Sequence, residues 1–277
     1  MLQSTTNDFY FAAVGDVHGQ MQNMVKLLSK WESRLGIKLA FVLQVGDFEP
    51  HRHEADLSTM SAPTKYKKLG DFPDYYSEKK FFPWPIYFIG GNHEPYGFLE
   101  QFPKGQKIIN NCYYLGRVSS NIIKGLNVVG LSGIYQKDKF HSLRPHFLEI
   151  YTKSNKEYIY FNEDDIAQAI DYKNADILLL HDCPSEIVNP SIIAEIIGFS
   201  IKYGDEIGNE FARMLVDLLL PKVVLCGHIH YKHYTHIVTS DNRKIEIYCL
   251  ADINKGDAAI ELFRVTPDGE IQKVLVD

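Results

Sequence analysis

Residues 9–19 read FYFAAVGDVHG, an apolar run that ends in a polar block flanked by glycines. The same arrangement recurs along the chain, and the polar blocks are GDVHG at residues 15–19, GD at 46–47, GGNHE at 90–94, HD at 181–182 and GHIH at 227–230. The runs before them are short and rich in β-branched or aromatic residues, which is typical of strands buried on both faces. We therefore predict buried strands at residues 9–14, 39–45, 86–89, 177–180 and 223–226.

These polar blocks are expected to meet in space. In an open α/β sheet the carboxyl ends of the strands form one edge, and ligand sites collect in the crevice outside it. Asp16 and His18 are two residues apart, as are His228 and His230, so each pair can project to one side of an extended chain and hold one ion. Carboxylate, imidazole and carboxamide donors together suit Mn, Fe, Zn or Ni. The sequence thus predicts a metal site built from distant segments.

The composition and periodicity favour one globular domain over residues 1–277. Hydrophobic residues at 45% and charged residues at 23% are ordinary globular values. Apolar stripes predict helices at residues 20–35 and 208–220 and a third helix capped by Asn162, while alternation predicts β hairpins over residues 237–277. Antiparallel strands late in an α/β chain fit a second sheet packed on the first. The predicted fold class is α/β, with two packed mixed β-sheets flanked by helices.

The charge and the cysteines restrict the function further. No apolar run approaches the roughly 20 residues that span a bilayer, and residues 1–8 are polar, so we expect a soluble cytoplasmic protein with no membrane partner. A net charge of −6 and a pI near 6.0 disfavour strong nonspecific nucleic-acid binding. The four cysteines are far apart and favour buried free thiols. Cys183 comes only two residues after His181, so a weak metal or redox role of this thiol stays open as an alternative.

Two long segments, residues 49–85 and 136–161, leave strand ends near the predicted metals. Long excursions on such a rim often carry lids or substrate-reading loops. We take four of their side chains as candidates for substrate contact: Lys65, Tyr66, Arg144 and His146. A lysine-rich stretch is more often a solvated face, and that alternative stays open. The apolar stretch 192–197 fits either the core or a dimer contact, so the oligomeric state is left open.

The five blocks, in this order, resemble the pattern of the calcineurin-like metallophosphoesterase family. The resemblance implies a four-layer αββα sandwich with two divalent or trivalent metal ions, of which Mn is our first choice and Fe, Zn or Ni are alternatives. It implies that one ion is held by Asp16, His18, Asp47 and His230, and the other by Asp47, Asn92, His181 and His228. Asp47 then bridges the two ions, and His93 is the histidine beside the leaving group rather than a ligand.

Within that family, further segments resemble the RNA lariat debranching enzymes over residues 9–236. These segments are residues 54–57, 60, 63, 65–66, 75–77, 89–94, 113–116 and 132–135. The resemblance implies hydrolysis of a 2′,5′ phosphodiester branch in RNA. Those enzymes usually carry cysteine where this chain has Asp16. They also continue well past the last polar block into a longer C-terminal portion, whereas residues 231–277 follow that block here.

We therefore predict a metal-dependent phosphoric ester hydrolase, and within that class a phosphodiesterase that acts on a nucleotide or RNA. Two cations about 3.5–4 Å apart would hold the hydroxide that attacks phosphorus. His93 would protonate the leaving oxygen. One alternative is a phosphomonoester or phosphoprotein phosphatase, which is disfavoured because Phe48-Glu49-Pro50 follows Asp47 in place of the Asp-Arg-Gly of serine/threonine phosphatases. The other is a non-catalytic binding scaffold, which the complete ligand set disfavours.

Overall fold

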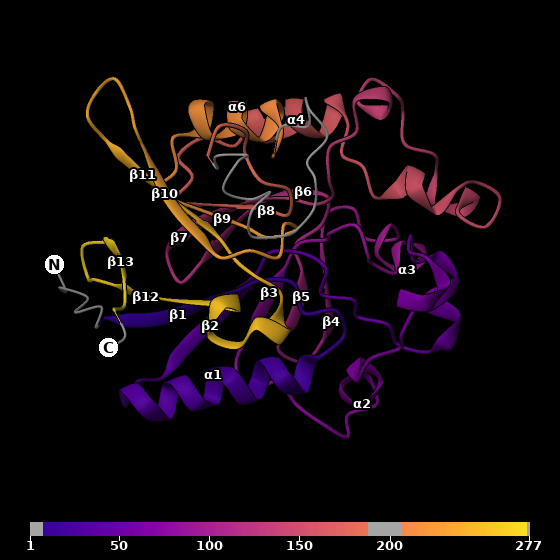
Figure 1. The fold of residues 1–277 in the computed structure, drawn as a ribbon, viewed down its shortest axis with the longest axis horizontal. Coiled ribbons are helices and arrows are strands. Elements are labelled where there is room, and N and C mark those ends of the chain that lie inside the picture. Colours follow the sequence, from indigo (N-terminus) through magenta and orange to yellow (C-terminus); the bar gives the residue numbers. More distant parts are fainter. Residues whose placement is uncertain (1–7, 188–206, 276–277) are drawn as a thin grey trace, which may run out of the picture.

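The strands form two sheets in the computed structural model, which describes residues 8–187 and 207–275 (Figure 1). The first sheet has the order β13-β12-β1-β2-β3-β5-β4. Its strands are β1 (Phe9–Val14), β2 (Leu39–Gln44), β3 (Ile86–Phe88), β4 (Gln106–Ile109), β5 (Cys112–Tyr114), β12 (Ile260–Val265) and β13 (Ile271–Lys273). The central strands β1, β2, β3 and β5 run parallel, while β12 pairs antiparallel with β1. Three of the predicted strands therefore lie side by side in this sheet.

The second sheet has the order β10-β11-β9-β8-β7-β6. Its strands are β6 (Val118–Ile123), β7 (Leu126–Leu131), β8 (Ile177–Leu180), β9 (Val223–Cys226), β10 (His233–Val238) and β11 (Lys244–Cys249). Here β7, β8, β9 and β11 run parallel, and the edge strands β6 and β10 run antiparallel to their neighbours. All residues of β8 and β9 are buried, which explains why these strands have no polar alternation.

Helices cover the outer face of each sheet, so the molecule has four layers (Figure 1). Helix α1 (Met21–Leu35) packs on the first sheet through Met24 and Leu28. Helices α4 (Glu163–Ile170) and α6 (Glu210–Leu219) cover the second sheet. A third apolar layer, which includes Phe11 and Leu179, fills the space between the sheets. The predicted fold class and the predicted helices are confirmed.

One expectation about the sheets is wrong. The polar blocks do not share the edge of a single sheet, because β1, β2 and β3 belong to the first sheet while β8 and β9 belong to the second. The late strands also do not form the second sheet by themselves. Strands β6 to β9 belong to that sheet together with β10 and β11, while the late β12–β13 hairpin extends the first sheet. Apolar runs predict that a strand is buried, but they do not identify its neighbour. The site therefore lies where the ends of two stacked sheets meet.

The two long excursions contain short helical turns and touch each other. Residues 49–85 include η1 (Glu54–Thr59), η2 (Thr64–Tyr66) and α2 (Phe72–Tyr76), and residues 136–161 include η3 (Lys137–Lys139), η4 (Phe147–Glu149) and η5 (Asn155–Tyr158). The Asn155 side-chain amide donates to the Ser58 carbonyl at 2.8 Å. The remaining short elements are α3 (Tyr96–Leu99) and η6 (Ile253–Ala259). The stretch 192–197 lies outside the described residues.

Candidate dinuclear metal centre

Each predicted ligand sits directly after a strand. Asp16 and His18 follow β1, Asp47 follows β2, Asn92 follows β3, His181 follows β8, and His228 and His230 follow β9. The ends of β1, β2 and β3 thus face the ends of β8 and β9 across the junction of the sheets. Seven side chains from distant parts of the sequence come together there.

Four of these side chains form a compact group. The ligand atoms of Asp16, His18, Asp47 and His230 all lie within 4.8 Å of one another. His230 Nε2 lies 2.9 Å from Asp16 Oδ2 and 3.2 Å from His18 Nε2. Asp16 and Asp47 are buried, whereas the His230 side chain is 44% exposed. The His18 side chain is 23% exposed, so the group is open to solvent on the side of its two histidines.

The donor atoms of this group fit a cation. Asp16 Oδ2 is buried, and its one close polar neighbour, His230 Nε2 at 2.9 Å, is not oriented for a regular hydrogen bond. A buried carboxylate oxygen without a well-formed hydrogen bond is costly. The facing Nε2 atoms of His18 and His230 also indicate a cation site. Only one of them can donate a proton to the other, whereas both can offer a lone pair to the same ion. A cation between these atoms would satisfy all three.

The other predicted ligands lie beside this group. His181 Nε2 is 3.1 Å from Asn92 Oδ1 and 3.5 Å from Asp47 Oδ1. The ring centroids of His181 and His228 are 5.0 Å apart. Asp47 is therefore near both sets of donors, as a bridging carboxylate must be. Two ions could be held with Asp47 between them.

Hydrogen bonds behind the ligands leave the Nε2 atoms of two histidines available. His18 Nδ1 lies 2.8 Å from Glu49 Oε1, and His181 Nδ1 lies 2.9 Å from the Val45 carbonyl oxygen. With Nδ1 donating to an oxygen, the neutral ring keeps its Nε2 lone pair for a metal. This role of Glu49 was not predicted from the sequence. The one available signal was the position of Glu49, two residues after the predicted ligand Asp47.

The charges of the group are strongly coupled. Burial raises the pKa of Asp47, but the charge and hydrogen bond of His181 hold that pKa well below its usual value. Burial lowers the pKa of His18, but the Glu49 hydrogen bond and the nearby carboxylates raise it to about 9. Burial also lowers the pKa of His181, but the charge and hydrogen bond of Asp47 outweigh this effect and raise that pKa to about 10. Protons therefore balance the carboxylates in the metal-free protein, and a cation would replace them.

The backbone around the site is held in an unusual conformation. His18, Asp47, Glu49, His228 and His230 all have positive φ values, between 48° and 66°. Such angles are uncommon in residues with a side chain and cost energy. They aim the ligand side chains inward from sharp turns. The grouping of so many positive-φ residues at one place supports a functional role of these turns.

Glycines beside the ligands let the backbones approach closely. A Cβ atom on Gly91 would lie 2.3 Å from Asp47 Oδ1, and one on Gly227 would lie 2.3 Å from Asp16 Oδ1. Both distances are far below any van der Waals contact, and the carboxylates cannot move away without leaving the group. The glycines in the polar blocks are therefore required by space as well as by turn geometry.

Glu94 joins two of the ligand-bearing loops. Its carboxylate is fully buried and accepts hydrogen bonds from the backbone N–H groups of Phe48, Glu49 and Gly91, at 2.9, 3.0 and 3.2 Å. Burial and the nearby Asp47 raise the Glu94 pKa to about 8. The loop after β2 and the loop after β3 are thereby fixed to each other. The sequence motif contained Glu94 but did not reveal this role.

His93 lies next to the first group without belonging to it. Its backbone N–H donates to Asp47 Oδ1 at 2.8 Å, and its ring centroid is 5.7 Å from that of His18. Its Nδ1 atom is buried and has no hydrogen-bond partner among the described residues. Asp182, the neighbour of His181, accepts hydrogen bonds from the Tyr135 N–H and the Asn209 side-chain amide, and so connects their loops.

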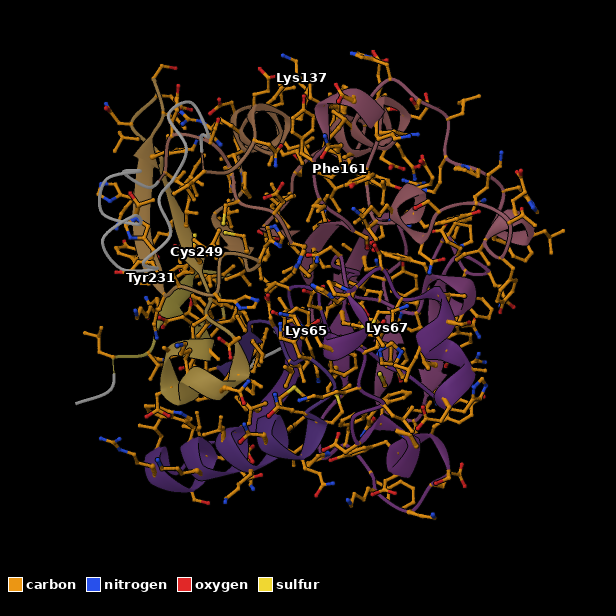
Figure 2. All side chains as sticks on the ribbon, turned by 45° about the vertical axis from the view of Figure 1, so that its right-hand side comes forward. Lys65, Lys67, Lys137, Phe161, Tyr231 and Cys249 are labelled. Atoms are coloured by element: carbon orange, nitrogen blue, oxygen red, sulfur yellow. The ribbon has the colours of Figure 1, made fainter. Side chains whose placement is uncertain are left out.

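The four candidate substrate contacts lie in different settings. Arg144 forms an ion pair with Asp165 and donates to the Tyr160 carbonyl, and His146 is exposed and caps η4. Lys65 and Tyr66 are exposed, and Lys65 Nζ lies 4.6 Å from the centre of the Tyr66 ring. Lys137, at the top of Figure 2, is well separated from Lys65 and Lys67. Lys137 therefore does not form one continuous patch with Lys65 and Lys67.

The fold and this geometry agree with a family comparison. The family described as calcineurin-like phosphoesterase matches residues 9–232. The chain belongs to the calcineurin-like phosphoesterase family. One solved structure aligns with 98% of this chain and all of its own, with a TM-score of 0.54 and 11% identity, which supports the fold alone.

Within this family, curated proteins named lariat debranching enzyme are similar to the chain. The Entamoeba histolytica protein is 33% identical over 232 residues, covering 81% of this chain and 65% of that protein. The Saccharomyces cerevisiae protein is 32% identical over 239 residues, covering 82% of this chain and 58% of that protein. The chain therefore spans less than two thirds of the length of these relatives. In the described residues no helix is long and apolar enough to cross a membrane.

Proposed function

We propose that this chain is a dinuclear-metal phosphodiesterase whose substrate is a 2′,5′ phosphodiester branch in RNA. The observation that carries the proposal is the meeting of carboxylate, imidazole and carboxamide donors from the ends of two stacked sheets. The similarity to proteins named lariat debranching enzyme supports the choice of substrate.

The proposed centre has two cation positions. Asp16, His18, Asp47 and His230 would hold one ion, and Asp47, Asn92, His181 and His228 the other. Bound there, the cations would supply charge to neutralise the phosphate oxygens and would lower the pKa of a water molecule. Oxygen and nitrogen donors of this mixture suit Mn, our first choice, as well as Fe, Zn or Ni.

His93 is the proposed proton donor to the leaving oxygen. Its backbone N–H is held by Asp47, while its ring is half-buried beside His18 and is not committed to another described side chain. The ring can therefore face a substrate bound at the centre. Water provides the nucleophile, so no covalent bond to the protein has to form, and the branch oxygen leaves with the proton from His93.

Lys65, Tyr66 and His146 remain proposed substrate contacts, because they are exposed on the two excursions that leave the rim of the site. A solvated lysine and an aromatic face are suited to a phosphate and a base, respectively. Arg144 remains a candidate on different terms. It would have to exchange its Asp165 partner for a phosphate, since its side chain is only 15% exposed.

A substrate panel tests this proposal. We expect metal-loaded protein to cleave 2′,5′-branched RNA in preference to linear RNA, cyclic nucleotides and aryl phosphomonoesters, and to require added metal after chelation. Asp47→Asn provides the control, because it should cleave none of them. Preferred cleavage of a phosphomonoester would favour a phosphatase, and cleavage of none by a metal-loaded protein would favour a binding scaffold.

A further inference from the structure

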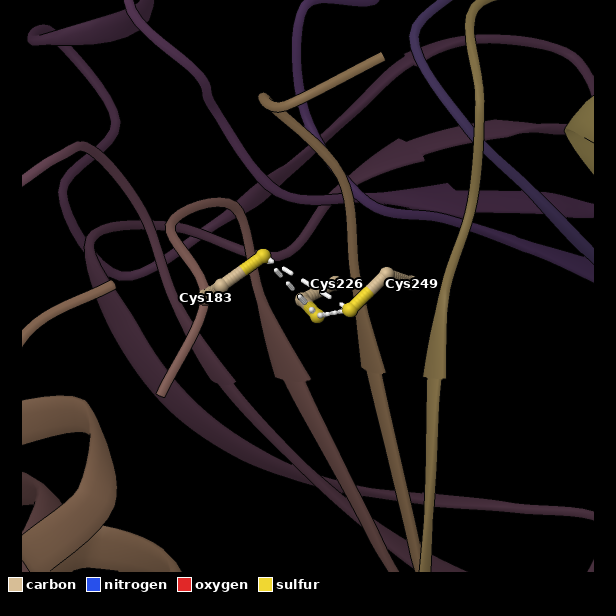
Figure 3. A group of neighbouring side chains, drawn as sticks. All are labelled: Cys183, Cys226 and Cys249. Carbon is tan, nitrogen blue, oxygen red and sulfur yellow. Dashed lines mark hydrogen bonds between the residues drawn. The ribbon is translucent and has the colours of Figure 1, made fainter. Parts of the chain in front are cut away.

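Three cysteines outside the proposed catalytic centre meet at the ends of the second sheet (Figure 3). Cys226 ends β9 and Cys249 ends β11, and the two residues are directly paired across these parallel strands. Cys183 comes from the loop after β8. The sequence separates them widely, and only the sheet order places them together.

The three sulfur atoms are very close and fully enclosed. The Sγ–Sγ distances are 3.2 Å between Cys226 and Cys249, 3.5 Å between Cys226 and Cys183, and 3.7 Å between Cys183 and Cys249. The residues are 0%, 1% and 0% exposed for Cys226, Cys249 and Cys183, respectively. All three are free thiols rather than disulfide partners.

These distances suit a single ion. The sulfur atoms lie on a circle of radius about 2.0 Å, so an ion about 2.3 Å from each sulfur would sit about 1.1 Å above their plane. The result is a shallow three-sulfur pyramid that needs little movement of the chain. Sulfur atoms this close leave no room for a cluster of several metals among them.

The donor set and its surroundings select the kind of ion. Among the described residues, no fourth histidine, cysteine, aspartate or glutamate joins the three sulfurs. The cysteines are part of the apolar core that also contains Leu180 and Val224. Thiolates select soft cations, and Zn usually takes four ligands in structural sites. A buried three-sulfur set is therefore better suited to Cu(I) than to Zn.

We propose that Cys183, Cys226 and Cys249 form a separate binding site for one soft thiophilic cation, Cu(I) in the first place. As the ion binds, the thiols it engages release their protons to solvent and the sulfur–metal bonds form without oxidation of either partner. The site differs in chemistry from the oxygen and nitrogen donors of the catalytic centre. The cysteine site would thus bind a soft cation and the catalytic centre harder ones, although the ligands of the two sites lie close in sequence.

The test measures copper on protein folded in its presence, because the buried thiols are closed to ions in the folded chain. The 277-residue chain is refolded without oxygen in buffered Cu(I), passed over a desalting column and analysed for metal. We expect one copper per chain in the wild type and at least a tenfold loss in Cys226→Ala. Cys112→Ala is the matched control, since Cys112 is a buried thiol in the first sheet, and it should keep its copper.

A second measurement avoids dependence on the variants. X-ray absorption at the copper edge of the wild-type protein should give three sulfur neighbours and no nitrogen neighbour. Asp47→Asn should give the same spectrum, because it alters only the catalytic centre. The proposal is overturned if copper has nitrogen neighbours, or if Cys226→Ala folds and keeps as much copper as Cys112→Ala.

Discussion

Asp47 is the residue on which the proposed centre depends most. It is 1% exposed, it lies near both sets of donors, and it holds the His93 backbone. Replacing one carboxylate oxygen with an amide nitrogen removes the bridge and the negative charge together. We predict that Asp47→Asn loses both ions, measured by metal analysis after dialysis. Retention of two ions per chain by this variant would show that Asp47 does not bridge.

His93 should behave differently from Asp47. We predict that His93→Ala keeps both metals and loses about 10²–10⁴ in turnover of a phosphodiester, which is the usual contribution of a general acid. The measurement pairs metal content with the hydrolysis of a bis-aryl phosphate and of branched RNA. An aryl leaving group needs less protonation, so the loss should be smaller for the aryl ester. Equal rates of wild type and variant on branched RNA would contradict the role.

Metal affinity should depend on pH in a defined direction. In the metal-free protein the pKa of His18 is raised to about 9 and that of His181 to about 10. Below pH 9 both rings carry a proton that a metal ion must displace. Affinity should therefore rise with pH, with about one released proton for each of the two histidines. Titration calorimetry in two buffers of different ionisation enthalpy counts these protons, and an affinity that does not change between pH 6 and pH 8 would count against this description.

At the scale of elements, a local sequence signal fixes the start of helix α4. This helix precedes β8, the strand before the predicted ligand His181. Asn162 caps the helix by accepting from the Asp165 N–H at 3.1 Å, and the Asp165 side chain accepts from the Asn162 N–H at 3.0 Å. The helix leads into β8, which His181 follows directly. This capping box was predicted in part from the sequence, because Asn162 precedes three acidic residues.

Loss of this cap should affect stability and not the metal centre. We predict that Asn162→Ala lowers the free energy of unfolding by about 1 kcal/mol, the usual effect of removing an N-cap. Urea denaturation measures the change, with Asn162→Asp as a control that keeps a capping oxygen. Metal content should stay at the wild-type value in both variants. A change below the error of the measurement would mean that the cap adds nothing to the packed helix.

At the scale of the whole molecule, the proposed metals connect the two sheets. Asp16 and Asp47 follow strands of the first sheet, while His181 and His230 follow strands of the second. A ligand that binds only the folded state stabilises it by about 2.7 kcal/mol at a concentration one hundred times its Kd. We predict that adding Mn to chelated protein raises the Tm of the wild type and leaves that of Asp47→Asn unchanged. A similar rise in both proteins would place the stabilising ion elsewhere.

The sequence predicts the parts of this architecture that depend on local pattern. The fully apolar run Ile177–Leu180 indicates a buried strand, and the chain forms one there. The same run does not indicate which strands it pairs with, and the division of the polar blocks between two sheets was missed for that reason. Side chains that act behind the ligands, such as Glu49 and Glu94, were missed because their hydrogen bonds reach backbone or rings distant in sequence. The cysteine cluster was missed because the sequence does not show that β9 and β11 are neighbours in the second sheet.

The most direct measurement is anomalous diffraction from crystals of the protein soaked in Mn. The proposed centre predicts two peaks near Asp47, one among Asp16, His18 and His230, and the other among Asn92, His181 and His228. The two peaks should be about 3.5–4 Å apart, the usual spacing of paired catalytic metals. Absence of both peaks at saturating Mn, or peaks only at other sites, would contradict the central claim.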